Sequence, residues 1–83
     1  MIPTHFTARH RAMLRAVADG RCQIVVRRAT NLTVDGLWCD FAATNDLVDN
    51  GLVRPAWAAP AGTVTPAVLT SAGTETLAVL TAA

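Results

Sequence analysis

Apolar residues near the start of the chain recur every three or four positions, which is the spacing of one helix face. The pattern predicts a helix over residues 7–20, with Thr7 as its N-cap and Gly20 ending it in a left-handed conformation. Phe6, directly before the cap, is expected to close over the helix start as a hydrophobic staple. The predicted buried stripe consists of His10, Met13, Leu14, Val17 and Ala18.

Short β-branched runs follow this helix, and they favour strands over residues 22–28, 31–34 and 37–39. Asp35 and Gly36 lie between the last two runs, and an Asp-Gly pair between apolar residues is a strong signal for a two-residue hairpin turn. This turn is the preferred interpretation of the segment. Trp38 is expected to lie in the core.

A second register is also open for this segment. A turn at Thr30 and Asn31 sets Cys22 opposite Cys39, and a cross-strand disulfide is then sterically conceivable. In a cytoplasmic chain, however, two cysteines are expected to be free and partly buried thiols.

A second helix is predicted over residues 40–51. Asp40 is the expected N-cap, because its carboxylate suits the positive end of a helix dipole, and Asn50 with Gly51 is a typical stop signal. The residues that share the predicted apolar face are Phe41, Thr44, Leu47 and Val48.

The last third of the chain is predicted to form two strands, over residues 52–57 and 63–69, joined by a turn at residues 60–62. Pro55 and Pro66 indicate edge positions, because proline donates no hydrogen bond to a ladder. Thr70 is expected to cap a final helix that runs from residue 71 to about residue 80. Leu77 and Leu80 would anchor this helix.

Two short motifs are similar to those of a known family. Residues 50–53, Asn-Gly-Leu-Val, resemble the junction between recognition helix and wing in winged helix-turn-helix proteins. Residues 69–73, Leu-Thr-Ser-Ala-Gly, are similar to the Leu-Thr-Pro-Ala-Gly start of the last helix in multiple-antibiotic-resistance-type regulators. The resemblance implies one α+β, winged-helix-like domain over residues 1–83, in the order helix, β hairpin, helix, two-stranded wing, helix. It also implies DNA binding and transcription regulation.

The chain departs from the family pattern at two points. A β segment between residues 22 and 39 replaces the second helix of the usual trihelical core. The expected recognition helix, residues 41–50, contains no arginine or lysine and includes Asp46 and Asp49, whose charges repel a phosphate backbone.

The composition is rich in apolar residues and poor in charge. The 83 residues are expected to form one domain. Of these residues, 52% are hydrophobic and 16% are charged, whereas about a quarter of the residues of an average protein are charged. Either alanine accounts for this balance, or an apolar surface is left for a homodimer or a docking partner. No signal peptide or membrane-spanning segment is visible, so a cytoplasmic location is expected. The absence of lysine is typical of a GC-rich coding source such as an actinobacterium or one of its phages.

The charges are divided unevenly along the chain. Residues 1–28 hold six arginines and one aspartate, whereas residues 29–83 hold one arginine and five acidic residues. Such a division indicates either an anion-binding face or two complementary surfaces that pair in a dimer.

The candidate binding residues follow from this division and from the resemblance. The set expected to contact double-stranded DNA consists of Arg9, Arg11, Arg15, Arg27, Arg28, Asn45 and Arg54. The alternative for the arginines is a solvated helix face and a strand edge protected by charge. Trp57 is a candidate for a protein interface if it is exposed, and the alternative is a tryptophan folded back over the sheet.

The sequence offers little support for metal binding or catalysis. His5, His10, Cys22 and Cys39 lack the spacing of metal-ligand pairs, so no metal site is expected. No catalytic motif is present, and neither enzyme activity nor a cofactor is expected. The expected function is therefore that of a small cytoplasmic DNA-binding or regulatory protein. The alternative is a protein–protein interaction module, either a homodimer or an adaptor or inhibitor of a host protein.

Overall fold

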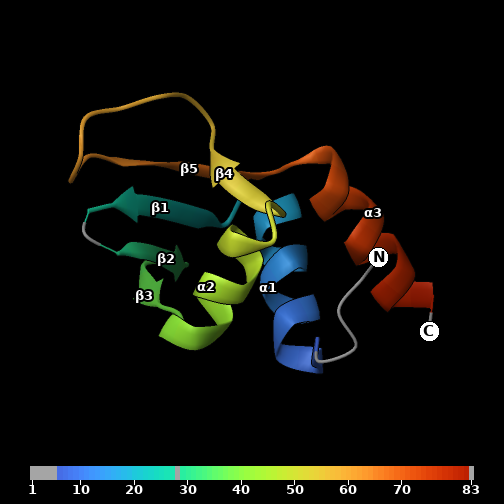
Figure 1. Cartoon of the computed structure of the whole chain (residues 1–83). Helices are drawn as coiled ribbons and strands as arrows, with labels where there is room; N and C mark the ends of the chain where they lie inside the picture. The colour runs from blue at the N-terminus through green and yellow to red at the C-terminus, as the bar shows by residue number, and fades with distance from the viewer. Residues whose placement is uncertain (1–5, 28, 83) are drawn as a thin grey trace.

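The computed structural model describes residues 6–27 and 29–82, and these form a small α+β domain of three helices and one antiparallel sheet (Figure 1). Their order agrees with the predicted succession of helices and strands. The elements are α1 (Ala8–Ala18), β1 (Cys22–Val26), β2 (Thr30–Val34), β3 (Leu37–Trp38), α2 (Phe41–Asp49), β4 (Val53–Pro55), β5 (Val64–Leu69) and α3 (Ser71–Ala82).

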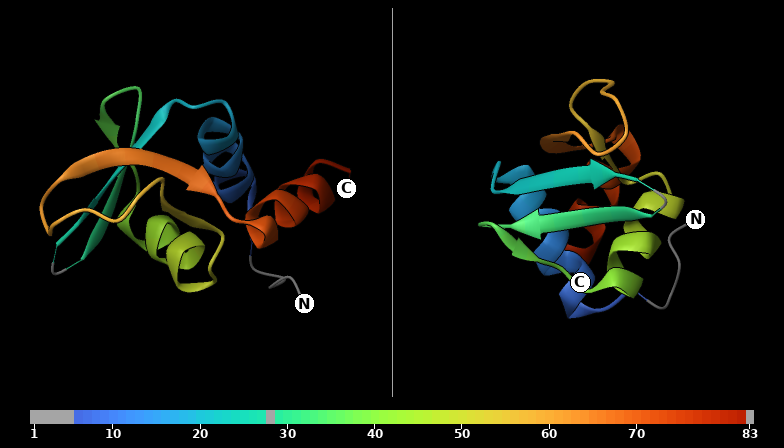
Figure 2. Two further views of the ribbon diagram at one scale, coloured as in Figure 1. Left: turned by 90° about the horizontal axis from the view of Figure 1, so that it is seen from above. Right: turned by 90° about the vertical axis from the view of Figure 1, so that its left-hand side faces the viewer.

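The sheet has the strand order β3-β2-β1-β5-β4, so β1 is its central strand and β3 and β4 are its edges. Helices α1 and α2 cover one face of the sheet, and the right-hand view of Figure 2 looks onto the opposite face, where β1, β2 and β3 lie in front of the helices. The core lies between these two layers. Its largest fully buried apolar side chains are Leu14, Ile24, Leu32 and Leu47.

The helix ends occur where the sequence predicts them. Gly20 has a φ of 76° and donates its N–H to the Val17 carbonyl, while Arg21 N–H donates to the Ala16 carbonyl, both at 3.1 Å. This pair of hydrogen bonds ends a helix on a left-handed residue, a conformation that glycine adopts without steric cost. The same arrangement ends α2 at Gly51.

The Asp35–Gly36 turn is confirmed, and the competing register is wrong. Both turn residues have positive φ angles, 52° and 83°, as a type I′ hairpin turn requires. A separate turn joins β1 to β2, and in that ladder Cys22 faces Val34 and not Cys39. Both cysteines are free.

Pro66 does not lie on an edge strand, contrary to prediction. β5 pairs with β1 on one side and with β4 on the other. Its first half, Val64 to Pro66, faces β1, and its second half, Ala67 to Leu69, faces β4. Pro66 is therefore the last residue of one ladder, where its missing N–H costs least. Pro55, in contrast, lies on the edge strand β4 as predicted.

Three apolar positions on the helices differ from the predicted core. On α1, Ala16 is buried and Ala18 is exposed, because the helix faces its neighbours through a stripe nearer to Val17. On α2, Phe41 is 54% exposed in the first turn of the helix, whereas Leu47 is fully buried in the core. None of the helices in residues 6–27 and 29–82 has the length and apolar character needed to cross a membrane.

Candidate interaction surfaces

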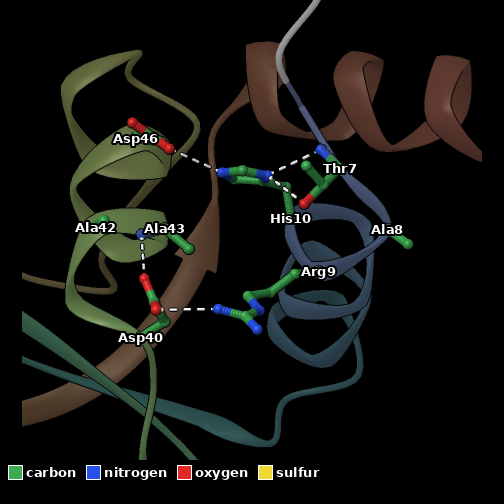
Figure 3. A pocket seen from close by; sticks show the side chains of 8 residues that line it. All are labelled: Thr7, Ala8, Arg9, His10, Asp40, Ala42, Ala43 and Asp46. Carbon is green, nitrogen blue, oxygen red and sulfur yellow. Dashed lines mark hydrogen bonds and ion pairs between the residues drawn. The ribbon is translucent and has the colours of Figure 1, made fainter.

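Two side-chain pairs connect α1 to α2 (Figure 3). Arg9 donates to the Asp40 carboxylate at 3.0 Å, and His10 Nε2 lies 2.9 Å from the Asp46 carboxylate. Asp40 also caps α2 by accepting the Ala43 N–H at 2.8 Å. That hydrogen bond, followed by the charge of Arg9, lowers the pKa of Asp40 below its ordinary value. Acidic residues of the expected recognition helix and its cap are therefore engaged by α1.

The imidazole of His10 acts as a helix cap. Its Nδ1 accepts the backbone N–H of Thr7 at 2.9 Å, which places the ring hydrogen on Nε2, where it can be donated to Asp46. His10 thus takes the part that a glutamate plays in a capping box. Phe6 stacks on its ring with centroids 4.9 Å apart, so the predicted staple closes on the third helical residue.

A shallow hollow of about 540 Å³ lies between the first turns of α1 and α2 (Figure 3). It contains a hydroxyl, an imidazole and a carboxylate in a row, since Thr7 Oγ1 lies 2.9 Å from His10 Nδ1. A general base needs a free lone pair to take a proton from a hydroxyl. Because Nδ1 already accepts the Thr7 N–H, this row supports capping and not nucleophilic catalysis.

A third ion pair holds the β2–β3 turn. Arg21 contacts both carboxylate oxygens of Asp35, and its shortest nitrogen–oxygen distance is 2.7 Å. The hydrogen bond between them lowers the pKa of Asp35 and raises that of Arg21. Arg15 of α1 has a longer contact, at 3.9 Å, with Asp19 at the C-cap of the same helix.

The expected DNA-binding arginines do not form one face. Among the described residues, Arg11, Arg27 and Arg54 have no acidic partner, and they lie on α1, at the β1–β2 turn and on β4 respectively. In Figure 1, the end of β1 lies at the left-hand side of the domain, whereas α1 lies near its middle. Arg27 follows the central strand, so it does not protect an edge. Arg28 lies outside the described residues.

The exposed side of α2 is not basic either. Asn45 is half-buried, and the exposed positions around it include Phe41, Ala42 and Asp49. An apolar and acidic helix surface is poorly suited to contacts with phosphates and base edges.

Three of the large exposed apolar side chains belong to β3 and the residues that follow it. Leu37 is 74% exposed, Trp38 68% and Phe41 54%, and the three lie within five consecutive positions. We call them the β3 edge patch. The predicted burial of Trp38 is wrong, because the Asp35–Gly36 turn pairs it with Thr33, on the face of the sheet that the helices do not cover. Sequence reasoning missed this patch, although strict alternation from the turn indicates where Trp38 points.

Trp57 is exposed, so the folded-back reading is wrong. It follows β4 in the loop to β5 and is 58% exposed. Since β3 and β4 are opposite edges of the sheet, Trp57 belongs to a separate surface.

The cysteines do not form a reactive centre. Burial raises the pKa of Cys22 to about 11, and burial followed by the charge of Asp40 raises that of Cys39. A raised pKa keeps a thiol protonated and a poor nucleophile near neutral pH. Within residues 6–27 and 29–82, no three His, Cys, Asp or Glu side chains come together as a metal site. His5 lies outside this range.

Comparison with protein-family models, with curated proteins and with solved structures finds no match for this chain.

Proposed function

We propose that this protein works by binding another polypeptide chain through the β3 edge patch. The main observation in support is that Leu37, Trp38 and Phe41 are all exposed beside an open sheet edge. Natural proteins usually protect such an edge with lysine, proline or inward-pointing charge. None of these occurs in β3, and a tryptophan at an exposed edge is a typical hot-spot residue.

The winged-helix assignment is part of the same proposal. Its support is that the two motifs on which the resemblance rests lie against each other. Thr70 N–H donates to the Leu52 carbonyl at 3.0 Å, and the Thr70 hydroxyl donates to the Gly51 carbonyl. On this reading the chain uses a regulator scaffold, in which β4 and β5 correspond to the wing, for contacts between proteins.

Selection of peptides from a displayed library against the purified protein tests this function. Enriched peptides should bind the wild type, and Trp38→Ser should weaken binding by about thirtyfold or more, because truncation of a hot-spot residue costs about 2 kcal/mol or more. Trp57→Ser is the matched control, since it removes a similarly exposed tryptophan that follows the opposite edge strand. If the peptides bind both variants equally well, the binding surface is not the β3 edge patch and the proposal is refuted.

A second candidate function is binding of duplex DNA. It is favoured by one observation, the hydrogen bond from Gly62 N–H to the Val26 carbonyl at 2.9 Å, which brings the β4–β5 loop to the β1–β2 turn. Arg27 lies at this junction, and Arg54 lies on β4, the strand that leads into the same loop. Phosphate contacts by both arginines would anchor the loop on a duplex.

A salt titration of binding to random duplex DNA tests this second function. Each lost phosphate contact should reduce the slope of log K against log salt by about 1. Arg27→Ala with Arg54→Ala should therefore flatten the titration. Arg9→Ala, whose guanidinium is paired with Asp40, should change it less. Absence of binding at low salt would eliminate the DNA function and leave the first proposal intact.

A further inference from the structure

The backbone of β3 presents one hydrogen-bonding position to the open edge of the sheet. Residues that flank a two-residue hairpin turn, here Val34 and Leu37, form a hydrogen-bonded pair of the ladder. The next bonded position is marked by Cys39 N–H, which donates to the Leu32 carbonyl at 2.9 Å. Trp38 lies between them in a non-hydrogen-bonded pair, so its own N–H and C=O point away from β2.

Apolar side chains surround this position on both faces of the sheet. Leu37 faces the helical side, in register with Val34, and Phe41 begins α2 on that side. Trp38 faces the bare side, in register with Thr33. A strand that pairs with this edge would therefore meet apolar surface above and below the new hydrogen bonds.

The edge is flanked by two aspartates whose charges are compensated within the chain. Asp35 before β3 is held by Arg21 at 2.7 Å, and Asp40 after β3 is held by Arg9 at 3.0 Å. An identical edge can approach without the like-charge repulsion that unpaired carboxylates would cause. The formal net charge of the chain, +1, adds little repulsion between copies.

We infer that the occupant of the β3 edge is a second copy of this chain, paired antiparallel with the first across a two-fold axis. The inference rests on the proposed function and names its partner. The axis passes beside Trp38, so that the N–H of each copy donates to the Trp38 carbonyl of the other. The two sheets then become one continuous sheet, and the same patch is used on both copies, as an isologous interface requires.

The shortness of the edge favours this occupant over an extended peptide. A peptide that adds a strand gains its affinity from a row of main-chain hydrogen bonds. β3 has only two residues, Leu37 and Trp38, and one outward-facing position. A second copy compensates for the short row, because it brings its own Leu37, Trp38 and Phe41 to the interface.

Sedimentation equilibrium from micromolar to near-millimolar concentration tests the inference. The wild type should show a reversible monomer–dimer equilibrium. Trp38→Ser should raise the dimer dissociation constant at least about tenfold, whereas Trp57→Ser should leave it unchanged. Circular dichroism should show both variants folded, since both side chains are mostly exposed. A wild type that stays monomeric throughout, or a dimer that both variants weaken equally, overturns the inference.

Amide exchange provides a readout specific for the paired backbone. The Trp38 amide should exchange with solvent more slowly as protein concentration rises, because dimerisation gives its outward N–H a partner. The Leu37 amide, which faces β2, should change much less. A Trp38 amide whose exchange is independent of concentration in a dimeric sample rules out β3 pairing. A monomer that still binds peptides through Trp38 refutes only the second-copy occupant, whereas a monomer without such binding refutes the proposed function too.

Discussion

At the scale of single residues, Gly73 stands out among the glycines because an added Cβ would meet backbone atoms at once. It lies in the first turn of α3 and is buried against the main chain of Leu52. A Cβ at this position would overlap the Leu52 carbonyl oxygen, which already accepts the Thr70 N–H. Backbone atoms held in a hydrogen bond cannot move aside cheaply, so only glycine fits here.

Gly73→Ala should therefore destabilise the protein, although the same change inside a helix normally stabilises it by about 0.5–1 kcal/mol. We expect a loss of about 1–3 kcal/mol in the free energy of unfolding, typical of an overpacked site. Urea denaturation followed by circular dichroism measures it. Thr74→Ala, at the exposed neighbouring position, should change stability by no more than about 0.5 kcal/mol. A gain in stability from Gly73→Ala would contradict the close approach of α3 to Leu52.

Residue roles that depend on near neighbours could be predicted from the sequence, and those that depend on distant residues could not. The caps at Asp40 and Thr70 are set within three residues and are confirmed. The contact between His10 and Asp46 joins positions 36 residues apart, and no local pattern indicates it. The exposure of Trp38 lies between these cases, because it follows from the turn by alternation but conflicts with the usual burial of tryptophan.

At the scale of elements, Thr70 connects two helices through one hydroxyl. The Thr70 hydroxyl accepts the Gly73 N–H at 3.0 Å and so caps α3, and it donates to the Gly51 carbonyl at the end of α2. A hydroxyl can do both because it carries one donor and two acceptor sites. The orientation of α3 relative to α2 therefore depends on this side chain.

Thr70→Ala should lower the free energy of unfolding by about 1–2 kcal/mol, the upper part of the range for a lost N-cap, because two hydrogen bonds disappear together. Thr70→Ser keeps the hydroxyl and should remain within about 0.5 kcal/mol of the wild type. Thermal or urea unfolding of the three proteins makes the comparison. If serine and alanine are equally damaging, the methyl group and not the hydroxyl holds the junction.

The strands could be predicted, but their complete pairing could not. The Asp35–Gly36 hairpin is local and follows from its turn residues. The central position of β1 depends on its pairing with β5, some 40 residues later, where Ile24 faces Thr65. A proline in a strand indicates an edge, because it has no N–H to donate to a neighbour. At Pro66, however, β5 changes its partner from β1 to β4, so the proline is tolerated inside the sheet.

At the scale of the whole molecule, some of the basic residues near the start of the sequence form ion pairs with acidic residues of the later part within the same chain. Basic residues of the first third bind acidic residues further along, through Arg9 with Asp40 and Arg21 with Asp35. The sequence suggested an anion-binding face or two surfaces that attract each other between copies. The intramolecular ion pairs neutralise part of the charge that an anion-binding face or a charge-paired dimer would need. The apolar β3 edge patch is therefore a more distinctive surface than any charged one.

These ion pairs should make the fold sensitive to acid. The pKa of Asp35 is lowered by its hydrogen bond with Arg21, and that of Asp40 by the Ala43 N–H and then Arg9. A carboxyl with a lowered pKa in the folded state stabilises the fold fully above its unfolded pKa, about 3.9. That contribution is lost as the pH falls through the lower pKa of the folded state.

Urea denaturation between pH 7 and pH 2 checks this expectation. The free energy of unfolding of the wild type should decline below about pH 4, where unfolded aspartate begins to take up protons. The double variant Asp35→Asn with Asp40→Asn should start lower and decline less steeply, although asparagine at position 40 retains a cap. Parallel curves for the two proteins would show that neither pair contributes to the acid response.

The place of β1 in the middle of the sheet also determines the order of events during synthesis. A ribosome releases the N-terminal segment first, so the arginines of α1 and those that flank β1 reach solvent well before residues 64–66 exist as a strand. Until β5 emerges, the nascent β1–β2–β3 meander has a second open edge along β1, whose side chains are mostly aliphatic. The last quarter of the chain thus closes the sheet, and a polypeptide truncated before Val64 would leave one edge of the aliphatic strand β1 unpaired and prone to aggregation.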